Sequence, residues 1–216
     1  MRYKAILFDL DGTLLDTLED LANSMNSVLS SLGFPTHEVS RYKAFVGEGV
    51  EYLAYCALPE NRRGQEMVSR CMALMREAYR ERWAEKTRPY PGILELLDEL
   101  SRQGIKMAIL SNKPDDFTQM ITEKFLSRWE FQCVVGAQDS LPKKPDPTAA
   151  LKISKRLGLV PGDFLYLGDT KIDMKTAADA GMYPVGALWG FRSQEELLEN
   201  GARVLIKHPT DLLNLI

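Results

Sequence analysis

The sequence has few of the features that place a protein in a membrane or outside the cell. It contains three cysteines among 216 residues and no CxxC pair. This odd, widely spaced set predicts reduced thiols that pack as small apolar side chains. No apolar run approaches the roughly 20 residues that cross a bilayer. The first apolar stretch is interrupted by Asp9 and Asp11, which is not typical of a signal peptide. We therefore expect a cytoplasmic protein that does not bind membranes.

A strong excess of charge of one sign is also absent. The 27 Lys and Arg residues face 30 Asp and Glu residues, for a formal charge of −3. This balance gives no sign of the basic domain or stripe that nucleic-acid binding requires. The 15 glycines and 11 prolines are ordinary numbers, which excludes collagen-like and low-complexity chains. The length fits either one large domain or a core with a smaller companion.

Short apolar runs that end at polar or turn residues predict buried strands. These runs are residues 3–8, 105–110, 131–135, 164–167, 185–188 and a short sixth one at 204–206. Helical patterns lie between them at 93–100, 148–157 and 171–180, each followed by a glycine that can end a helix. The alternation of helix and strand predicts an α/β fold, with a Rossmann-like, doubly wound parallel sheet that has helices on both faces.

Residues 17–88 depart from this alternation. Apolar residues at helical spacing predict an amphipathic helix from about Leu18 to Leu32, with Thr17 as its N-cap and Gly33 at its end. A longer helix is predicted around 67–78, and no strand pattern is present. We therefore expect a core of residues 1–16 and 89–216 and an inserted, all-helical domain of residues 17–88, with residues 88–92 as the return linker.

The first candidate site is Asp9-Leu10-Asp11-Gly12-Thr13, directly after the first predicted strand. Ligands of open α/β sheets bind outside the carboxyl ends of the strands, and Asp9 lies at such an end. Two carboxylates at this spacing repel each other unless a cation or a proton intervenes. A solvated turn is an equally good interpretation of this segment alone.

The second candidate site is the segment from Gly168 to Asp173, which again follows an apolar strand. Asp169 falls at the end of the strand and Asp173 in the first turn of the next helix, where helix capping is the simpler explanation of an acidic residue. Carboxylates from two strand ends are the hard oxygen ligands that suit Mg²⁺, together with water and a substrate phosphate. The two segments therefore predict a magnesium site.

Two further segments offer groups that bind phosphate. Ser111-Asn112-Lys113 follows the strand at 105–110, and a hydroxyl beside backbone N–H groups can cradle a phosphate at a strand-to-helix turn. Ser-Asn is also common turn chemistry. Lys144 stands before Pro145, which restricts its backbone, although a lysine pair such as Lys143 and Lys144 is usually solvated.

In this order the four segments resemble the haloacid dehalogenase superfamily of phosphohydrolases, over essentially the whole chain. The resemblance implies that Asp9 is a nucleophile that forms an aspartyl-phosphate, and that Asp11 is the general acid and then the general base. Dehalogenases of this superfamily lack the aspartate at the position of Asp11, which disfavours carbon–halogen cleavage. The residues that the resemblance assigns to the phosphoryl group are Ser111 and Lys144, with Thr13 and Asn112 in support.

The same resemblance implies a Mg²⁺ ion held by the side chains of Asp9 and Asp169 and by the backbone carbonyl of Asp11. Asp173 is either a ligand through water or a partner of the ligands. The expected function is therefore a Mg²⁺-dependent phosphatase that acts on small phosphorylated metabolites. The alternatives are a pyrophosphatase, a sugar-phosphate mutase of the same superfamily, or a non-catalytic protein that binds phosphate or Mg²⁺. The intact motifs argue against the last of these.

In this superfamily a helical insertion at this point of the chain is a mobile cap over the active site. Gly47-Glu48-Gly49 falls where such caps carry a substrate-facing loop, although a plain turn between helices fits equally well. Several segments resemble the phosphoglycolate phosphatase branch most, namely 16–21, 32–35, 46–49 and 189–191. Bacterial members of that branch tend to have Asn between the two glycines. Glu48 is awkward for an acidic substrate and, unless Arg41, Lys43 or another base offsets its charge, points to a different, hydroxylated phosphate ester.

Overall fold

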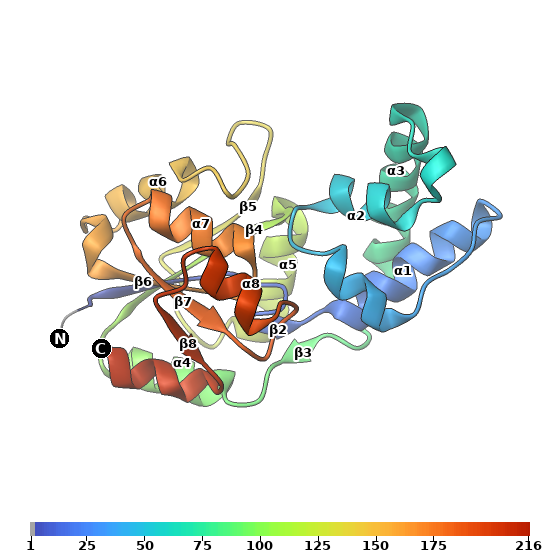
Figure 1. Cartoon of the computed structure of the whole chain (residues 1–216). Helices are drawn as coiled ribbons and strands as arrows, with labels where there is room; N and C mark the ends of the chain where they lie inside the picture. Colours follow the sequence, from blue (N-terminus) through green and yellow to red (C-terminus); the bar gives the residue numbers. More distant parts are fainter. Residues whose placement is uncertain (1–2) are drawn as a thin grey trace. The chain divides into compact units, whose positions relative to one another are not determined.

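The computed structural model describes residues 3–216 and divides the chain into two compact units (Figure 1). One unit comprises the chain up to Leu15 together with Pro89–Ile216, and the other is Asp16–Arg88. The first unit contains the sheet, and the second consists of helices and turns apart from single residues in the connecting strands.

The first unit is built on a six-stranded sheet with the order β5-β4-β1-β6-β7-β8, in which all the paired strands run parallel. Its strands are β1 (Ala5–Phe8), β4 (Lys106–Pro114), β5 (Cys133–Ala137), β6 (Phe164–Gly168), β7 (Tyr183–Ala187) and β8 (Val204–Ile206). The chain adds β4 and β5 on one side of β1 and then β6, β7 and β8 on the other. This doubly wound order confirms the predicted fold class and places the reversal beside β1, where such sheets bind ligands.

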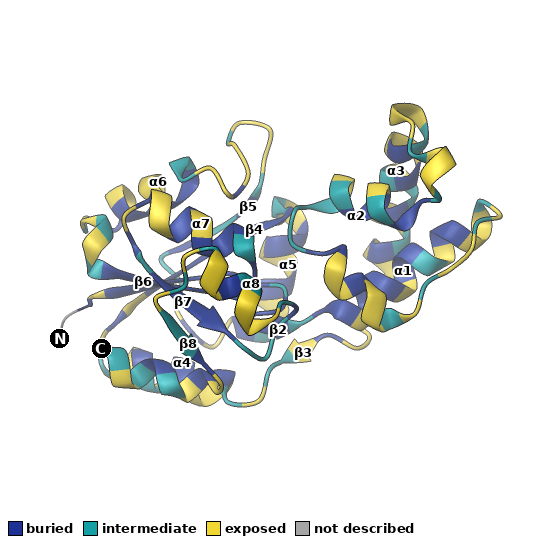
Figure 2. Ribbon diagram, viewed as in Figure 1, coloured by how far each residue is buried: buried dark blue, intermediate teal, exposed yellow. Residues whose placement is uncertain are grey.

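Helices cover both faces of this sheet. They are α4 (Ile93–Arg102), α5 (Asp115–Leu126), α6 (Thr148–Arg156), α7 (Lys171–Asp179) and the short α8 (Gln194–Glu199). Buried residues of α6 and α7 form one core cluster with residues of β1, β4 and β6. Figure 1 shows α4 on the opposite side of the sheet. Figure 2 shows that the central strands β1, β4, β6 and β7 are mostly buried while the helices expose their outer sides. The near-continuous apolar strands follow from this coverage of both faces.

The second unit contains α1 (Leu18–Ser31), α2 (Val50–Ala57) and α3 (Gln65–Arg82), with 3₁₀ turns at Val39–Ala44 and Glu60–Arg62. The expected cap of α1 is wrong in one respect. Thr17 occupies the N-cap position, but its hydroxyl has no hydrogen-bond partner among the described residues. Its backbone (φ −106°, ψ 0°) lacks the extended conformation that aims an N-cap side chain at the first turn.

Asp20, in the first turn of α1, ties the two ends of the helical unit together. Its buried carboxylate accepts hydrogen bonds from the backbone N–H of Lys86 at 3.0 Å and of Thr87 at 2.9 Å, and from the Thr87 hydroxyl at 2.8 Å. This contact joins residues 67 positions apart, so no local pattern of the sequence could show it.

Two short strands connect the units, and they correct the expected return linker. β2 (Leu15–Asp16) pairs with β3 (Arg88–Pro89). The linker therefore begins as a strand, and Arg88, the last residue of the helical unit, is the first residue of β3. The Arg88 guanidinium lies 3.5 Å from the Asp16 carboxylate. Strands of two residues are too short to show an alternating pattern, which explains why the sequence did not indicate them.

The structure agrees with the expected packing for two of the three cysteines. All three are free, with Cys71 and Cys133 buried and Cys56 half-buried. Among residues 3–216, every helix is too short or too polar to cross a membrane.

Candidate active site

Three aspartates meet at the carboxyl edge of the sheet. Phe8 and Leu167 are paired in the parallel ladder of β1 and β6, so Asp9 and Asp169 leave neighbouring strands at the same edge. Asp173 joins them from the first turn of α7. One carboxylate oxygen of each residue lies within 4.8 Å of the others, and all three residues are buried. The three oxygens are the hard donors that Mg²⁺ prefers, so the cluster fits that ion.

Asp169 is held in place by two hydrogen bonds. Its Oδ1 accepts from the Thr13 hydroxyl at 2.8 Å, and its Oδ2 accepts from the backbone N–H of Phe191 at 2.8 Å. A Cβ atom on Gly190 would overlap the Asp169 side chain, so the close approach of these segments requires glycine. Thr13, expected as a phosphate contact, thus orients a candidate metal ligand in this structure.

Asp173 both caps α7 and belongs to the carboxylate cluster. Its Oδ2 accepts hydrogen bonds from the Thr170 hydroxyl at 2.6 Å and the Thr170 backbone N–H at 3.0 Å, which completes a capping box. Its Oδ1 accepts from Lys144 Nζ at 2.7 Å. Asp173 can therefore cap the helix and belong to the site at once, because Oδ2 caps the helix and Oδ1 contacts Lys144.

Lys144 is not a solvated lysine. Its side chain is 2% exposed, and its ammonium group donates to Asp9 Oδ1 at 2.8 Å as well as to Asp173. The Asn112 side chain clamps the backbone of Lys144, donating to its carbonyl at 3.0 Å and accepting from its N–H at 2.9 Å. Asn112, also expected as a phosphate contact, therefore positions the lysine.

The electrostatics of the cluster favour a bound cation. Burial, followed by the charge of Asp173, raises the pKa of Asp9 well above its ordinary value, although Lys144 opposes the shift. The same two causes raise the pKa of Asp169 to about 7. Burial disfavours the charged form of Lys144, but Asp173 and Asp9 outweigh it and raise the lysine pKa. A divalent cation among the carboxylates would lower their pKa values and favour their ionised forms.

The segment Ser111-Asn112-Lys113 lies elsewhere than expected. It belongs to β4 itself and not to a turn after the strand, at a point where the register with β5 shifts between Leu110 and Pro114. The Ser111 hydroxyl is buried and accepts a hydrogen bond from the Lys113 backbone N–H at 3.2 Å. The polar segment therefore forms the carboxyl-terminal part of β4, which a local apolar pattern does not reveal.

Lys113 is a residue that sequence reasoning missed. Its ammonium group contacts both carboxylate oxygens of Asp11, at 3.1 and 3.0 Å, and its side chain is 3% exposed. The available signal was a lysine three residues after the end of the apolar run 105–110 and next to two candidate phosphate-binding residues. The two aspartates of the first segment thus have separate lysine partners, because Asp9 pairs with Lys144.

Gly47, Glu48 and Gly49 lie in the helical unit, between the 3₁₀ turn that ends at Ala44 and α2. Gly47 has φ 124° and Gly49 has φ 95°, a backbone region that residues with a Cβ rarely adopt. The loop therefore depends on both glycines for its shape. Contact of this loop with a substrate stays a prediction.

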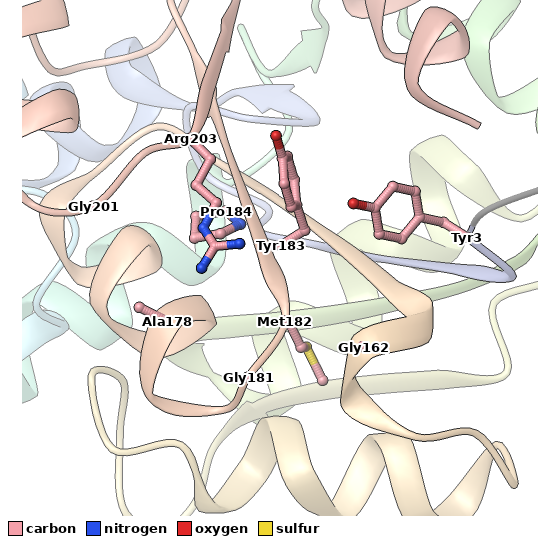
Figure 3. Close-up of a pocket in the computed structure, with 9 residues that line it drawn as sticks. All are labelled: Tyr3, Gly162, Ala178, Gly181, Met182, Tyr183, Pro184, Gly201 and Arg203. Carbon is pink, nitrogen blue, oxygen red and sulfur yellow. The ribbon is translucent and has the colours of Figure 1, made fainter.

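A pocket of about 460 Å³ lies at the amino ends of the strands, opposite the carboxylate cluster (Figure 3). Its lining includes Tyr3 and Arg203, which precede β1 and β8, and Tyr183, which begins β7. The ring centroids of Tyr183 and Tyr3 are 5.6 Å apart, and the Arg203 guanidinium carbon lies 5.6 Å from the centroid of the Tyr183 ring. These residues stand at the amino ends of the strands, so the pocket is separate from the carboxylate cluster.

Comparison with known proteins agrees with this geometry. Residues 6–187 match the family model of haloacid dehalogenase-like hydrolases. Phosphoglycolate phosphatase 1 of Pseudomonas aeruginosa is 34% identical over 97% of this chain and 78% of its own length. Phosphoglycolate phosphatase of Aquifex aeolicus is 32% identical over 99% of this chain and 96% of its own length. The crystal structure of a predicted phosphoglycolate phosphatase from Haemophilus somnus 129pt superposes with a TM-score of 0.91 at 27% identity, covering 100% of this chain and 98% of that one.

Proposed function

The chain belongs to the family of haloacid dehalogenase-like hydrolases and is a phosphatase, and on this premise we propose that it hydrolyses small phosphate monoesters with Mg²⁺, through an aspartyl-phosphate on Asp9. One observation carries the proposal. Asp9 is buried at the end of a central strand, 2.8 Å from the Lys144 ammonium, and has two further carboxylates beside it. A nucleophile, a cation for the phosphoryl group and a set of metal ligands thus occupy one place.

The proposed reaction has two steps. In the first, a carboxylate oxygen of Asp9 attacks phosphorus, the bond from phosphorus to the ester oxygen breaks, and Asp11 gives a proton to the leaving alcohol. In the second, Asp11 takes a proton from water as that water attacks phosphorus, and the bond between Asp9 and phosphorus breaks. The Ser111 hydroxyl and the Lys144 ammonium bind the phosphoryl oxygens, and both side chains are buried. Splitting the hydrolysis replaces one difficult step by two easier ones.

The residues suited to hold Mg²⁺ are Asp9 and Asp169, with the backbone carbonyl of Asp11, and Asp173 directly or through water. When bound, the ion supplies positive charge that offsets the negative charge of the phosphoryl group and the aspartates.

Stabilisation of the protein by Mg²⁺ is expected to increase as the pH rises through about 7. The pKa of Asp169 is raised to about 7 in the fold, against roughly 3.9 in an unfolded chain. Between these values the folded, metal-free protein binds an extra proton. Its free energy of unfolding therefore falls as the pH rises and Asp169 becomes a buried charge. Mg²⁺ requires the ionised carboxylate and must displace that proton at lower pH.

Thermal unfolding with and without MgCl₂ at about pH 5.5 and about pH 8 checks this expectation. The rise in Tm caused by Mg²⁺ should be larger at the higher pH, and Asp169→Asn should remove most of it. The exposed Asp139 provides a matched control, because Asp139→Asn should retain the full effect. An equal rise at both pH values in the unchanged protein would show that Asp169 does not control metal binding.

The substrate is tested by a panel of phosphate esters in the presence of Mg²⁺. The names of the relatives make phosphoglycolate the first candidate, and pyrophosphate, sugar phosphates and nucleotides complete the panel. Release of phosphate is the expected result. Phosphoglycolate should have the highest kcat/KM of the panel if Glu48 does not contact the substrate, and a hydroxylated, uncharged ester should have it if Glu48 repels acidic substrates. Preference for pyrophosphate, or transfer of phosphate within a sugar, would identify a pyrophosphatase or a mutase. The absence of any reaction would favour a non-catalytic protein that binds phosphate or Mg²⁺.

We further propose that the helical unit is a cap and that its loop at Gly47–Gly49 takes part in substrate selection. If Glu48 contacts the substrate, its charge repels an acidic ester. Glu48→Asn should then raise kcat/KM for phosphoglycolate by roughly tenfold relative to a hydroxylated, uncharged ester such as glycerol phosphate. The variant Glu51→Gln, at an exposed position in the first turn of α2, is the control. An unchanged ratio of the two kcat/KM values would exclude Glu48 from substrate selection.

A further inference from the structure

We propose that Lys113 is a positioning residue for Asp11: it holds the carboxylate of the resting enzyme by both oxygens and releases one of them when a phosphate ester binds. The inference rests on the proposed function, in which Asp11 transfers protons to and from the reacting oxygens. Lys113 itself is given no contact with the substrate. Its effect passes through Asp11.

The contact between Lys113 and Asp11 is symmetric and largely shielded from water. The Nζ atom lies 3.1 Å from Oδ1 and 3.0 Å from Oδ2, and the two side chains are 3% and 12% exposed. Exposed lysine–aspartate pairs contribute little because water screens them and both side chains stay mobile. Neither condition holds here, so the ammonium group restricts the orientation of the carboxylate.

The backbone of Lys113 is itself fixed on both sides of its Cα. Its N–H donates to the Ser111 hydroxyl at 3.2 Å, and its carbonyl accepts from the Thr118 hydroxyl of α5 at 3.1 Å. Lys113 lies in the part of β4, between Leu110 and Pro114, where the register with β5 shifts. Lys113 therefore starts from a rigid position, as a residue that orients a catalytic group must.

The geometry also implies that the resting position of Asp11 is not the reacting one. To give a proton to a leaving oxygen, one carboxylate oxygen of Asp11 must face that oxygen at hydrogen-bond distance. Both oxygens of Asp11 instead face the Lys113 ammonium. One of the two contacts must lengthen in the complex with the substrate, while the other continues to orient the group. Misplacement of a reacting group by about 1 Å can cost roughly 100-fold in rate.

A double-mutant cycle tests whether Lys113 acts through Asp11. Lys113→Met keeps the length of the side chain and removes the charge, and it should lower kcat for an alkyl phosphate by roughly 10- to 100-fold with little change in KM. In the Asp11→Asn background the same substitution should lower kcat by no more than about twofold, because residues that act as a unit are not additive. Lys143→Met, at an exposed lysine, is the matched control and should leave kcat unchanged.

The leaving group separates a positioning role from a merely structural one. p-Nitrophenolate leaves without a proton, so the pre-steady-state burst of its release reports the attack of Asp9 alone. Lys113→Met should change this burst rate little while it slows the alkyl ester. Equal slowing of both substrates, additive losses in the cycle, or an unchanged kcat for the alkyl ester would each overturn the inference.

The fold and the proposed function are checked separately. If Lys113→Met lacks the circular dichroism spectrum of the unchanged protein, the cycle is repeated with Lys113→Arg, which keeps the charge but alters the distance to Asp11. Failure of the proposed function would appear as an inactive unchanged protein or an active Asp9→Asn variant. Failure of the inference leaves both of those results intact and affects only the coupling between Lys113 and Asp11.

Discussion

Replacing Asp9 with Asn is expected to lower kcat by roughly 10⁴-fold or more while the protein stays folded. The amide is a poor nucleophile and cannot form the aspartyl-phosphate, so the two-step reaction cannot take place. The fold should persist because burial and the charge of Asp173 disfavour the ionised form of Asp9, which means that the native structure gains little from this charge. Loss of one carboxylate should also weaken the binding of Mg²⁺.

Three measurements check this result. Phosphate release gives kcat, intact mass after rapid quenching detects a covalent phosphoryl group on the unchanged protein but not on the variant, and thermal unfolding confirms the fold. Asp179→Asn, at an exposed position near the end of α7, should behave like the unchanged protein. Turnover of the Asp9→Asn variant at the ordinary rate would exclude Asp9 as the nucleophile.

Replacing Lys144 with Met is expected to damage both activity and stability. The ammonium group contacts Asp9 at 2.8 Å and Asp173 at 2.7 Å, and its removal leaves buried carboxylates without their cation. Breaking a buried ion pair from one side typically costs about 3–5 kcal/mol in the free energy of unfolding. The phosphoryl group also loses a positive charge in a shielded site, which should lower kcat by roughly 10³-fold.

The loss of stability in Lys144→Met should depend on pH and on the metal. The pKa of Asp9 is raised well above its ordinary value even with Lys144 present. At acid pH the carboxylates take up protons, and the positive charge of the ammonium group then stabilises them less. The difference in Tm from the unchanged protein should therefore shrink. Mg²⁺ at neutral pH should restore part of the stability but not the activity. Lys143→Met is the control, and a Lys144→Met variant as stable and active as this control would contradict the assignment.

Much of the core could be predicted because the determining signals are local. Strands covered on both faces are apolar along their length, as in Phe164–Gly168, which the sequence indicated to within one residue. Glycines just beyond the helices marked their ends. The short strands β2 and β3 and the missing hydroxyl contact of Thr17 escaped prediction, because each depends on a neighbouring segment or on backbone angles that composition does not encode.

The sequence by itself determined that acidic residues stand at two strand ends and that a lysine lies before a proline, because each position follows from a local apolar run or turn. It also carried the resemblance that implied a phosphatase. Only the tertiary structure decided how these groups are paired. Lys113 and Asp11 are 102 residues apart, and Lys144 and Asp9 are 135 residues apart. Such partners meet through the parallel register of the sheet and the irregularity in β4, which are properties of the assembled strands and not of any one segment.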